Sequence, residues 1–511
     1  MPTSFDVVDL FAGPGGLAEG FSAFEAEGHR PFDIRLSVEK EASAHRTLRF
    51  RAFLRTCRDE HGAFPDAYYD FINRGGSEPD WAKLFPREWA EADHEAQRLE
   101  LGTKVAEGII DARIRDLRSR GRRSLLVGGP PCQAYSLVGR ARNRGTTGYV
   151  PSEDHRHFLY REYIRILKTL EPDAFVMENV KGILSSSVDG AAVFERVLDD
   201  LRDAGYSLLA LTQSEGRTTL REPAQPRDFV IRAETFGVPQ ARHRVIVIGV
   251  RNDVRSRISD LSAAVHLPIP PRACADDVLE GLPRLRSGLS RNDSEQAWRE
   301  SISSQFDVAR AAIATLPTEI RVWAMGELED AASASRASNA PLQRSSSVPS
   351  SFGDQCPDEL RAWLTDGRLT ATMDHASRGH IETDLGRYLF CALFARAMDR
   401  SPKASEFPAA LAPDHANWTS GKFADRFRVQ RRGAPATTVT SHIAKDGHYF
   451  IHPDPVQCRS LTVREAARLQ TFPDNYRFLG NRTEQYVQVG NAVPPFLARQ
   501  IAAALYGALI L

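Results

Sequence analysis

The chain has few cysteines, and none of them has a spacing that is typical of a structural role. Its six cysteines, among 511 residues, form no CxxC pair and no Cys/His cluster with metal-ligand spacing. This argues against a disulfide framework and a structural zinc site, and it indicates a reducing compartment. We therefore expect a protein that binds no metal.

An excess of one charge and long apolar runs are also missing. The 66 basic and 66 acidic residues give a net charge of zero, so a nucleic-acid-binding surface would have to be local. No apolar run reaches the length of roughly 20 residues that a membrane helix needs. The first residues show no basic segment followed by a cleavage site. These absences predict a soluble, cytoplasmic protein with no membrane partner.

The length of the chain predicts two or three domains, because one core rarely serves so many residues. Residues 1–251 have an α/β pattern, interrupted at about 46–122 by a segment of mostly helical composition. Residues 252–454 are less regular and predict a second, smaller domain. Within them, the Ser/Ala-rich stretch at about 331–351 predicts a flexible linker or a disordered insertion.

A glycine-rich turn lies near the start of the chain. Residues 5–11 predict a strand, residues 12–16 (AGPGG) a turn and residues 17–27 a helix, and a second strand at 34–38 ends at Glu39. In nucleotide-binding folds such glycines let a ligand approach the backbone, and the acidic residue accepts from ribose hydroxyls. The segment also fits the GxGxxA pattern, so an NAD- or FAD-dependent dehydrogenase is an alternative.

A cysteine follows another predicted strand. The apolar residues 125–127 precede the segment Gly128–Ser136 (GGPPCQAYS), which places Cys132 on a Pro-Pro turn. In open α/β sheets, ligands and chemistry collect at the carboxyl ends of the strands. Cys132 is therefore a candidate nucleophile, although most cysteines are buried small hydrophobes. Its neighbours must decide between these roles.

Charged side chains lie at the ends of two further predicted strands. Glu178 ends the strand at 174–177, where a partly buried carboxylate can hold a proton for catalysis, although it can also serve as a helix cap or an ion-pair partner. Arg242 and Arg244 stand two residues apart at the start of the strand at 245–250. This spacing predicts that both face an anionic or carbonyl-rich ligand.

Six motifs, taken together and in order, resemble the DNA (cytosine-5)-methyltransferase family. They are Asp9–Gly16 (DLFAGPGG), Gly129–Gln133 (GPPCQ), Glu178–Val180 (ENV), Gln240–Arg244 (QARHR), Arg464–Pro473 (REAARLQTFP) and Gly490–Pro495 (GNAVPP). The resemblance implies an α/β, doubly wound, Rossmann-like class I methyltransferase domain with a mostly parallel sheet. It also implies that residues 252–454 form an irregular target-recognition domain and that residues 455–511 return to complete the catalytic domain.

The resemblance implies covalent catalysis on cytosine. Cytosine C5 is a weak nucleophile, and addition of a thiolate at C6 makes it electron-rich. The family pattern gives the addition to Cys132, contact with N3 to Glu178 and contact with O2 to Arg244. Arg242 belongs to the same catalytic set, and we expect it to order the neighbouring loop.

The resemblance also implies S-adenosyl-L-methionine as the cofactor. The expected cofactor-binding residues are Phe11, Ala12, Gly13, Pro14, Gly15, Gly16, Glu39, Pro131, Asn491 and Ala492. One position departs from the family, which offers an aspartate to the adenine amino group after its third strand. No confident match lies between 46 and 122, and Leu101–Gly102 is a possible substitute.

Double-stranded DNA is the expected partner, with the target base flipped out of the helix. The arginine-rich segment at 139–148 is typical of a mobile loop that meets phosphates. Residues 426–432 are basic with an interleaved aromatic, and with the segment from 437 to a turn at 445–447 they predict a strand and a hairpin; an ordinary basic edge strand is the alternative. The predicted DNA-binding residues are Gln133, Ser136, Arg140, Arg142, Arg144, Arg428, Arg431 and Thr440.

The sequence thus predicts a DNA (cytosine-5)-methyltransferase of a restriction-modification or phage-defence system. We expect it to act on DNA as a monomer, with restriction or defence proteins as possible partners. Two alternatives stay open: a nucleic-acid-binding or RNA cytosine methyltransferase with altered catalysis, and, remotely, a nucleotide-dependent oxidoreductase.

Overall fold

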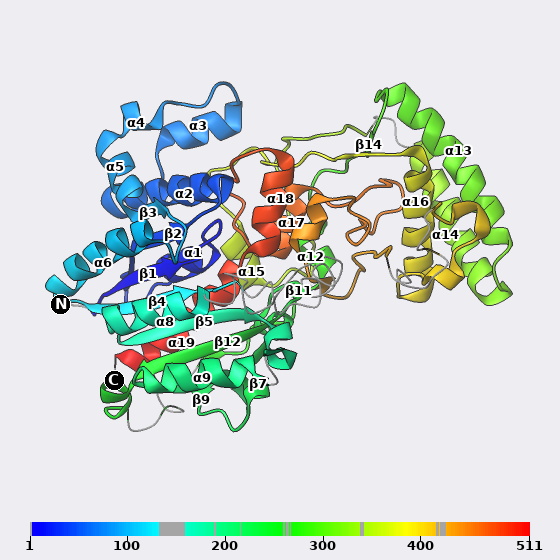
Figure 1. The fold of residues 1–511 in the computed structure, drawn as a ribbon. Helices are drawn as coiled ribbons and strands as arrows, with labels where there is room; N and C mark the ends of the chain where they lie inside the picture. Colours follow the sequence, from blue (N-terminus) through cyan, green and yellow to red (C-terminus); the bar gives the residue numbers. More distant parts are fainter. Residues whose placement is uncertain are drawn as a thin grey trace.

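A computed structural model shows a large sheet that carries helices on both faces, with a group of helices remote from it (Figure 1). The structure describes residues 3–131, 159–188, 191–214, 216–258, 261, 265, 267–337, 342–414, 418 and 426–510. Both chain termini lie on the sheet side of the molecule (Figure 1). Among the described residues, no helix combines the length and the apolar character that crossing a bilayer requires.

The central sheet has ten strands, in the order β13-β9-β8-β12-β5-β4-β1-β2-β3, with β10 paired to β12. Their bounds are β1 Phe5–Leu10, β2 Phe32–Glu39, β3 Ala96–Arg98, β4 Arg123–Gly128, β5 Ala174–Val180, β8 Tyr206–Ser214, β9 Arg217–Arg221, β10 Val230–Arg232, β12 His243–Arg251 and β13 Leu267–Pro268. Five of them, β1, β2, β4, β5 and β12, were predicted from the sequence, and each runs within a few residues of its predicted range.

The half of the sheet that contains β1 is parallel. β1 pairs with β2 and β4, β2 pairs with β3, and β4 pairs with β5, all in parallel. β12 then runs antiparallel to both β5 and β8. The predicted fold class, a mostly parallel doubly wound α/β domain, is confirmed. The carboxyl ends of β1, β2, β4 and β5 consequently meet at one edge.

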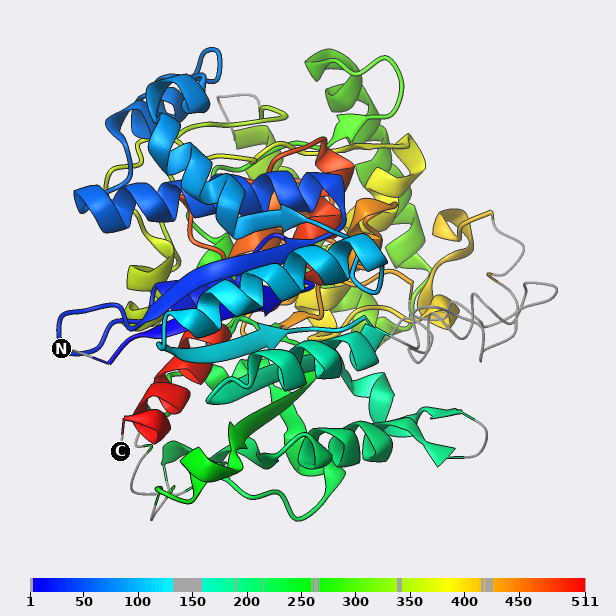
Figure 2. The ribbon, with the colours of Figure 1, turned by 60° about the vertical axis from the view of Figure 1, so that its left-hand side comes forward.

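Helices cover both faces of this sheet because the central strands carry apolar side chains on both of their faces. On one face, Phe5 and Val7 pack with α1 (Gly16–Ser22) and α19 (Pro495–Leu509). On the other face, Val8 and Leu10 pack with α6 (Lys104–Ser119), α8 (Leu159–Leu170) and α9 (Val193–Asp203). The turned view shows α19, in red, beside the strands close to the chain's start (Figure 2).

The predicted helical insertion is largely helical but supplies one strand. It contains α2 Ala42–His61, α3 Asp66–Arg74, α4 Trp81–Leu84, α5 Pro86–Glu95 and α6, and its strand β3 adds to the edge of the sheet. Aromatic side chains such as Phe50, Phe53, Tyr68 and Trp81 form its own small core. β3 was missed because three residues with one apolar side chain carry no periodic signal.

The second region has its own helical core. The helices α13 Glu295–Ala314, α14 Thr318–Ala337 and α16 Glu382–Met398 pack together at the end of the molecule remote from the sheet (Figure 1). Segments at 273–279, 356–364 and 436–450 instead share a hydrophobic cluster with residues 461–496. The proposed domain boundaries at 251 and 454 therefore stay predictions.

The structure contradicts two local predictions for this region: the linker at about 331–351 in its first seven residues, and the hairpin. Residues 331–337 end α14, with Ala331 and Ala332 buried, because alanine favours helix even within a Ser-rich stretch. In place of the predicted hairpin, a short 3-10 helix covers Ser441–Ala444. The two-residue strand β16 (Ala436–Thr437) pairs with β11 (Gln240–Ala241).

Side-chain amides account for the missing hairpin. Gln430 Oε1 accepts from the Thr437 backbone amide at 2.8 Å, and Gln240 Oε1 accepts from the Val439 amide at 2.7 Å. These amides are thus satisfied without a partner strand.

The described residues form several further helices. They include α10 Asn252–Arg255, α12 Ala275–Leu279, α15 Asp358–Leu364, α17 Val463–Leu469 and α18 Arg482–Asn491.

Candidate active site

The glycine-rich loop between β1 and α1 is held by hydrogen bonds at its base. The Ala12 amide donates to Val38 O at 3.0 Å, and the Gly13 amide donates to Glu39 Oε2 at 2.9 Å. Phe11 and Gly13 have φ angles of 57° and 58°, in the left-handed region. The loop and the end of β2 therefore bring Phe11, Gly13 and Glu39 together, as the sequence predicted for a nucleotide ligand.

Glu39 is in a mostly desolvated position. Its Oε1 also accepts from the Glu41 amide at 2.7 Å, while burial raises the pKa of the carboxyl above its ordinary value. A Cβ built on Gly13 would meet nothing within 4 Å, so open space lies beside the loop. An acceptor carboxylate next to a bare backbone loop fits an adenosine-containing ligand.

The far end of the chain closes against the same loop. A Cβ on Gly16 would lie 2.2 Å from Val493 O, so α1 and the segment after α18 are in direct backbone contact. Asn491, which ends α18, is exposed, and Ala492 next to it is buried with its carbonyl accepting from Gln470. The C-terminal segment thus packs against the start of α1, directly after the glycine-rich loop.

Glu178 and Arg244 form an ion pair at the carboxyl edge of the sheet. Glu178 lies near the end of β5, Arg244 lies near the start of the antiparallel β12, and Glu178 Oε1 is 2.9 Å from Arg244 Nε. Both side chains are about 85% buried, at 15% and 13% exposure. Burial lowers the pKa of Arg244, and the nearby Glu178 carboxylate opposes that shift.

The turn that precedes Cys132 lies directly beside this pair. A Cβ on Gly129 would be 2.9 Å from Glu178 Oε2, and Asn179 Nδ2 donates to Pro130 O at 3.1 Å. Pro131 is half-buried and is the last described residue of this turn. Cys132 itself lies outside the described residues.

Arg242 contacts a different set of groups from Arg244. Its guanidinium is fully buried and donates to Val439 O at 2.7 Å and to Gly490 O at 3.3 Å. These carbonyls belong to the second region and to α18, so Arg242 ties three segments together. Burial, with Arg244 nearby, holds the pKa of Arg242 well below its usual value.

The predicted DNA-binding residues fall into two groups. Arg428 is half-buried against the Tyr449 ring, Arg431 pairs with Asp399 at 2.7 Å, and Thr440 caps the 3-10 helix beside Gly490. These three come from the second region. The others lie outside the described residues: Gln133, Ser136, Arg140, Arg142 and Arg144.

The segment after β3 lies beside the end of β2. The Leu99 amide donates to Glu39 O at 3.2 Å, and Leu101 is buried beside Gly102. Leu101–Gly102 therefore lies two residues beyond a direct contact with Glu39. Its contact with adenine stays a prediction.

One residue near the cofactor loop was missed by sequence reasoning. Tyr476 is fully buried, and its hydroxyl donates to the carbonyl of Pro14. No periodicity or local motif links two residues so far apart in the chain.

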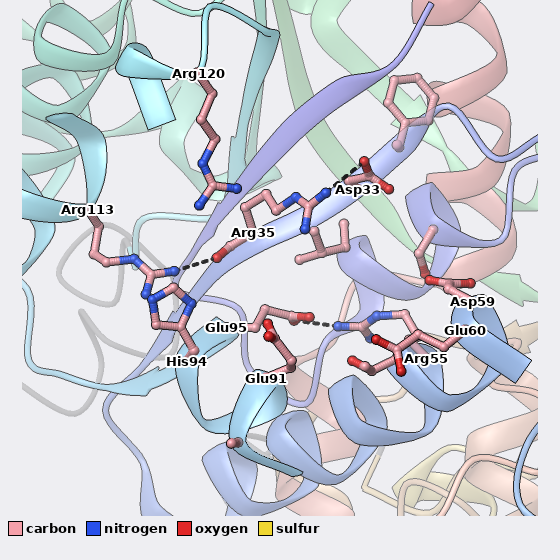
Figure 3. Close-up of a pocket in the computed structure, with 15 residues that line it drawn as sticks. Asp33, Arg35, Arg55, Asp59, Glu60, Glu91, His94, Glu95, Arg113 and Arg120 are labelled. Carbon is pink, nitrogen blue, oxygen red and sulfur yellow. Dashed lines mark hydrogen bonds and ion pairs between the residues drawn. The ribbon is translucent and has the colours of Figure 1, made fainter. Parts of the chain in front are cut away.

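A cavity of about 580 Å³ lies away from this edge, between the insertion and the amino-terminal half of β2 (Figure 3). The close-up shows Arg55 paired with Glu95, and Arg113 donating to Arg35 O (Figure 3). At its rim, Glu60 forms a potential cation cluster with His61 and Glu88. Arg87 already pairs with Glu60 and Glu88 there.

Comparison with known proteins identifies the family. The model of the C-5 cytosine-specific DNA methylase family matches residues 102–507. The chain belongs to this family. It is thereby an enzyme of the DNA (cytosine-5)-methyltransferase class, and the oxidoreductase alternative is wrong.

Two bacterial relatives match this chain over nearly its whole length. A type II methyltransferase of Bacillus paralicheniformis is 31% identical over 98% of each chain. A type II methyltransferase of Thalassovita gelatinovora is 27% identical, again over 98% of each chain. Among solved structures, a prophage-encoded E. coli protein with a DNA modification methyltransferase assignment has a TM-score of 0.55 at 18% identity. That likeness covers 99% of this chain and 100% of the other, and it supports the fold.

Proposed function

We propose that this protein transfers a methyl group from S-adenosyl-L-methionine to C5 of a cytosine flipped out of duplex DNA. The contact between Glu178 and Arg244 carries the proposal. N3 and O2 are adjacent on one edge of cytosine, so a carboxylate and a guanidinium already in contact are spaced to meet both atoms. The ring would then lie beside the Gly129–Pro131 turn that leads to Cys132.

The chain's own groups would carry the chemistry around that ring. The Cys132 thiolate adds to C6, while Glu178 and Arg244 disperse the charge that develops at N3 and O2. When bound, the cofactor would supply a methyl group from its sulfonium sulfur, which would be left as a neutral thioether. After C5 has taken the methyl group, a base would remove the C5 proton, and the C6–S bond would break to release the Cys132 thiolate.

The cofactor would be held by the two ends of the chain. The loop residues Gly13 and Gly15 would lie along it, Phe11 against the adenine, and Glu39 at the ribose hydroxyls. Asn491 and Ala492 would close the pocket from α18. The mostly desolvated carboxylate of Glu39 and the open space beside Gly13 support this assignment.

The names of the relatives support a role in host DNA modification. We infer that the protein is the methyltransferase of a restriction-modification system, acts as a monomer on DNA in the cytoplasm, and takes its sequence specificity from the second region. The DNA contacts assigned to the arginine-rich loop and to Arg428, Arg431 and Thr440 belong to this proposal.

The test is tritium transfer from labelled S-adenosylmethionine to duplex DNA or to RNA, with Cys132→Ser beside the wild type. We expect label in DNA alone, and a loss of at least about 10³-fold in the variant, because no other group replaces the thiolate. A 5-fluorocytosine duplex should trap the wild type covalently. Label in RNA alone would favour the RNA methyltransferase alternative, and full activity of the variant would contradict the role of Cys132.

A further inference from the structure

The glycine-rich loop has one open side and one packed side. Open space surrounds the position of a Cβ on Gly13, whereas a Cβ on Gly15 would lie 2.9 Å from Leu48 Cδ1 and 3.1 Å from the Tyr476 hydroxyl. A cofactor can approach the first side. The second side is covered by the helical insertion and by a residue from the C-terminal segment.

Tyr476 completes the anchoring of this loop. Pro14 has no backbone N–H, so its carbonyl is its one main-chain hydrogen-bonding group. That carbonyl accepts from the Tyr476 hydroxyl. The loop is otherwise held through the Ala12 amide on Val38 O at 3.0 Å and the Gly15 amide on Ala12 O at 2.9 Å. Without Tyr476, a buried carbonyl would be left unpaired at the centre of the loop.

Tyr476 is itself held firmly in place. Its backbone amide donates to Pro473 O at 2.8 Å, and its carbonyl accepts from Arg464 Nη2 at 2.9 Å. The ring is stacked under the Arg51 guanidinium, whose carbon lies 4.7 Å from the ring centroid. Burial raises the pKa of Tyr476 far above neutral pH, so the hydroxyl keeps its proton as a donor.

The insertion helix α2 joins the loop, helix α1 and Tyr476. Arg51 donates to both carboxylate oxygens of Glu19 on α1, at 2.8 and 2.5 Å, and to Asn475 O at 3.2 Å. Leu48, about one turn earlier on α2, contacts the packed side of the loop. Because Arg51 and Glu19 are both buried, this ion pair fixes the helices against each other.

We propose that Tyr476, backed by α2 of the insertion, is a positioning residue that presets the glycine-rich loop for the cofactor. It sets the affinity for S-adenosylmethionine, because a preformed loop needs no ordering on binding. It does not contact the reacting atoms, so the rate of methyl transfer from the saturated enzyme is unaffected. This inference rests on the proposed cofactor site, and it assigns a function to the insertion.

The experiment compares Tyr476→Phe with the wild type and with a matched control in the full-length protein. In the control, Tyr206→Phe, an equally buried hydroxyl is removed from the carbonyl of Pro172 at the other end of the sheet, a contact of 2.9 Å. Calorimetry should show about 10-fold weaker binding of S-adenosylmethionine and S-adenosylhomocysteine to Tyr476→Phe, roughly the loss of one hydrogen bond to a buried group. Tyr206→Phe should bind both as the wild type does.

Two further measurements make the outcome decisive. Amide hydrogen exchange at residues 12–16 of the ligand-free protein should be faster in Tyr476→Phe, and kcat at saturating cofactor should stay within about twofold of the wild type. Unchanged affinity and exchange, or a fall in kcat alone, would overturn the inference.

A second variant covers the case in which Tyr476→Phe does not fold. Leu48→Ala should then show the same weaker binding, and wild-type affinity in Leu48→Ala would overturn the inference instead. A wild-type protein that binds neither ligand would contradict the proposed function itself.

Discussion

At the residue scale, the proposed chemistry depends on two charged side chains that come from different strands. Glu178 and Arg244 were each singled out by their positions at strand ends, but neither position alone predicts their contact at 2.9 Å. Because the pair is mostly buried, each side chain neutralises the charge of the other when no base is bound. A cytosine edge that enters the site would take over part of this pairing.

Glu178→Gln tests that role directly. The amide keeps the size of the carboxyl but cannot exchange a proton with N3, so we expect methyl transfer to fall by roughly 10²–10⁴-fold. DNA and cofactor affinities should change little, because the neutral amide still fits the site. Single-turnover methyl transfer, with dissociation constants from fluorescence anisotropy and calorimetry, checks this. A parallel loss of DNA binding would show that the residue acts in assembly of the site.

At the element scale, glycines decide how closely α1 approaches the C-terminal segment. Gly16 allows Val493 O to come close, and Gly20 allows Pro495 O to do so at the start of α19. The sequence marked Gly16 as a ligand-binding residue. The structure adds that it is also a packing residue, since a Cβ there would lie 2.2 Å from a backbone oxygen.

Gly16→Ala should destabilise the protein by about 1–3 kcal/mol, because the added methyl forces α1 and residue 493 apart. Gly108→Ala is the control: Gly108 is exposed within α6, and a Cβ there meets nothing within 4 Å. That change should instead stabilise by about 0.5–1 kcal/mol, since alanine favours helix. Urea denaturation measures both. Equal effects of the two substitutions would contradict the close contact.

At the scale of the whole molecule, the second region carries buried histidines, three of which, His375, His380 and His452, contact the C-terminal segment. Burial lowers the pKa values of His375, His380, His448 and His452, and it lowers that of His452 to about 3 with Arg459 beside it. In the unfolded chain these histidines titrate near 6.5. The folded state therefore binds fewer protons below that pH, and its stability decreases as the pH falls from about 6.5 towards 3.

His452→Gln should weaken this acid sensitivity. Between pH 7.5 and 5 the wild type should lose about 2 kcal/mol through this one group, the cost of keeping it neutral while the unfolded chain is protonated. The variant should lose correspondingly less over that range. Urea midpoints at the two pH values provide the measurement. An identical pH dependence in both proteins would show that the pKa of His452 is the same in the folded and unfolded states.

The sequence by itself determined the chemistry and the central fold. Strong apolar runs predicted the strands at 5–11, 125–127 and 174–177. Six motifs in order predicted the family, because the order of motifs can be read from the chain alone. Composition was less reliable: the Ser/Ala-rich stretch at about 331–351 predicted a linker, whereas its first residues, 331–337, end α14, because alanine favours helix.

Only the tertiary structure decided which distant residues meet. The Tyr476 hydroxyl on the Pro14 carbonyl, and Arg242 on the carbonyls of Val439 and Gly490, join segments that lie far apart in the chain. The insertion helix α2 likewise packs against the glycine-rich loop, which belongs to a separate element. Local patterns report which face of an element is apolar, whereas these contacts arise when separate elements pack and their buried polar groups must find partners. The reaction could thus be predicted from the chain, whereas the contacts between distant segments that hold the site in place could not.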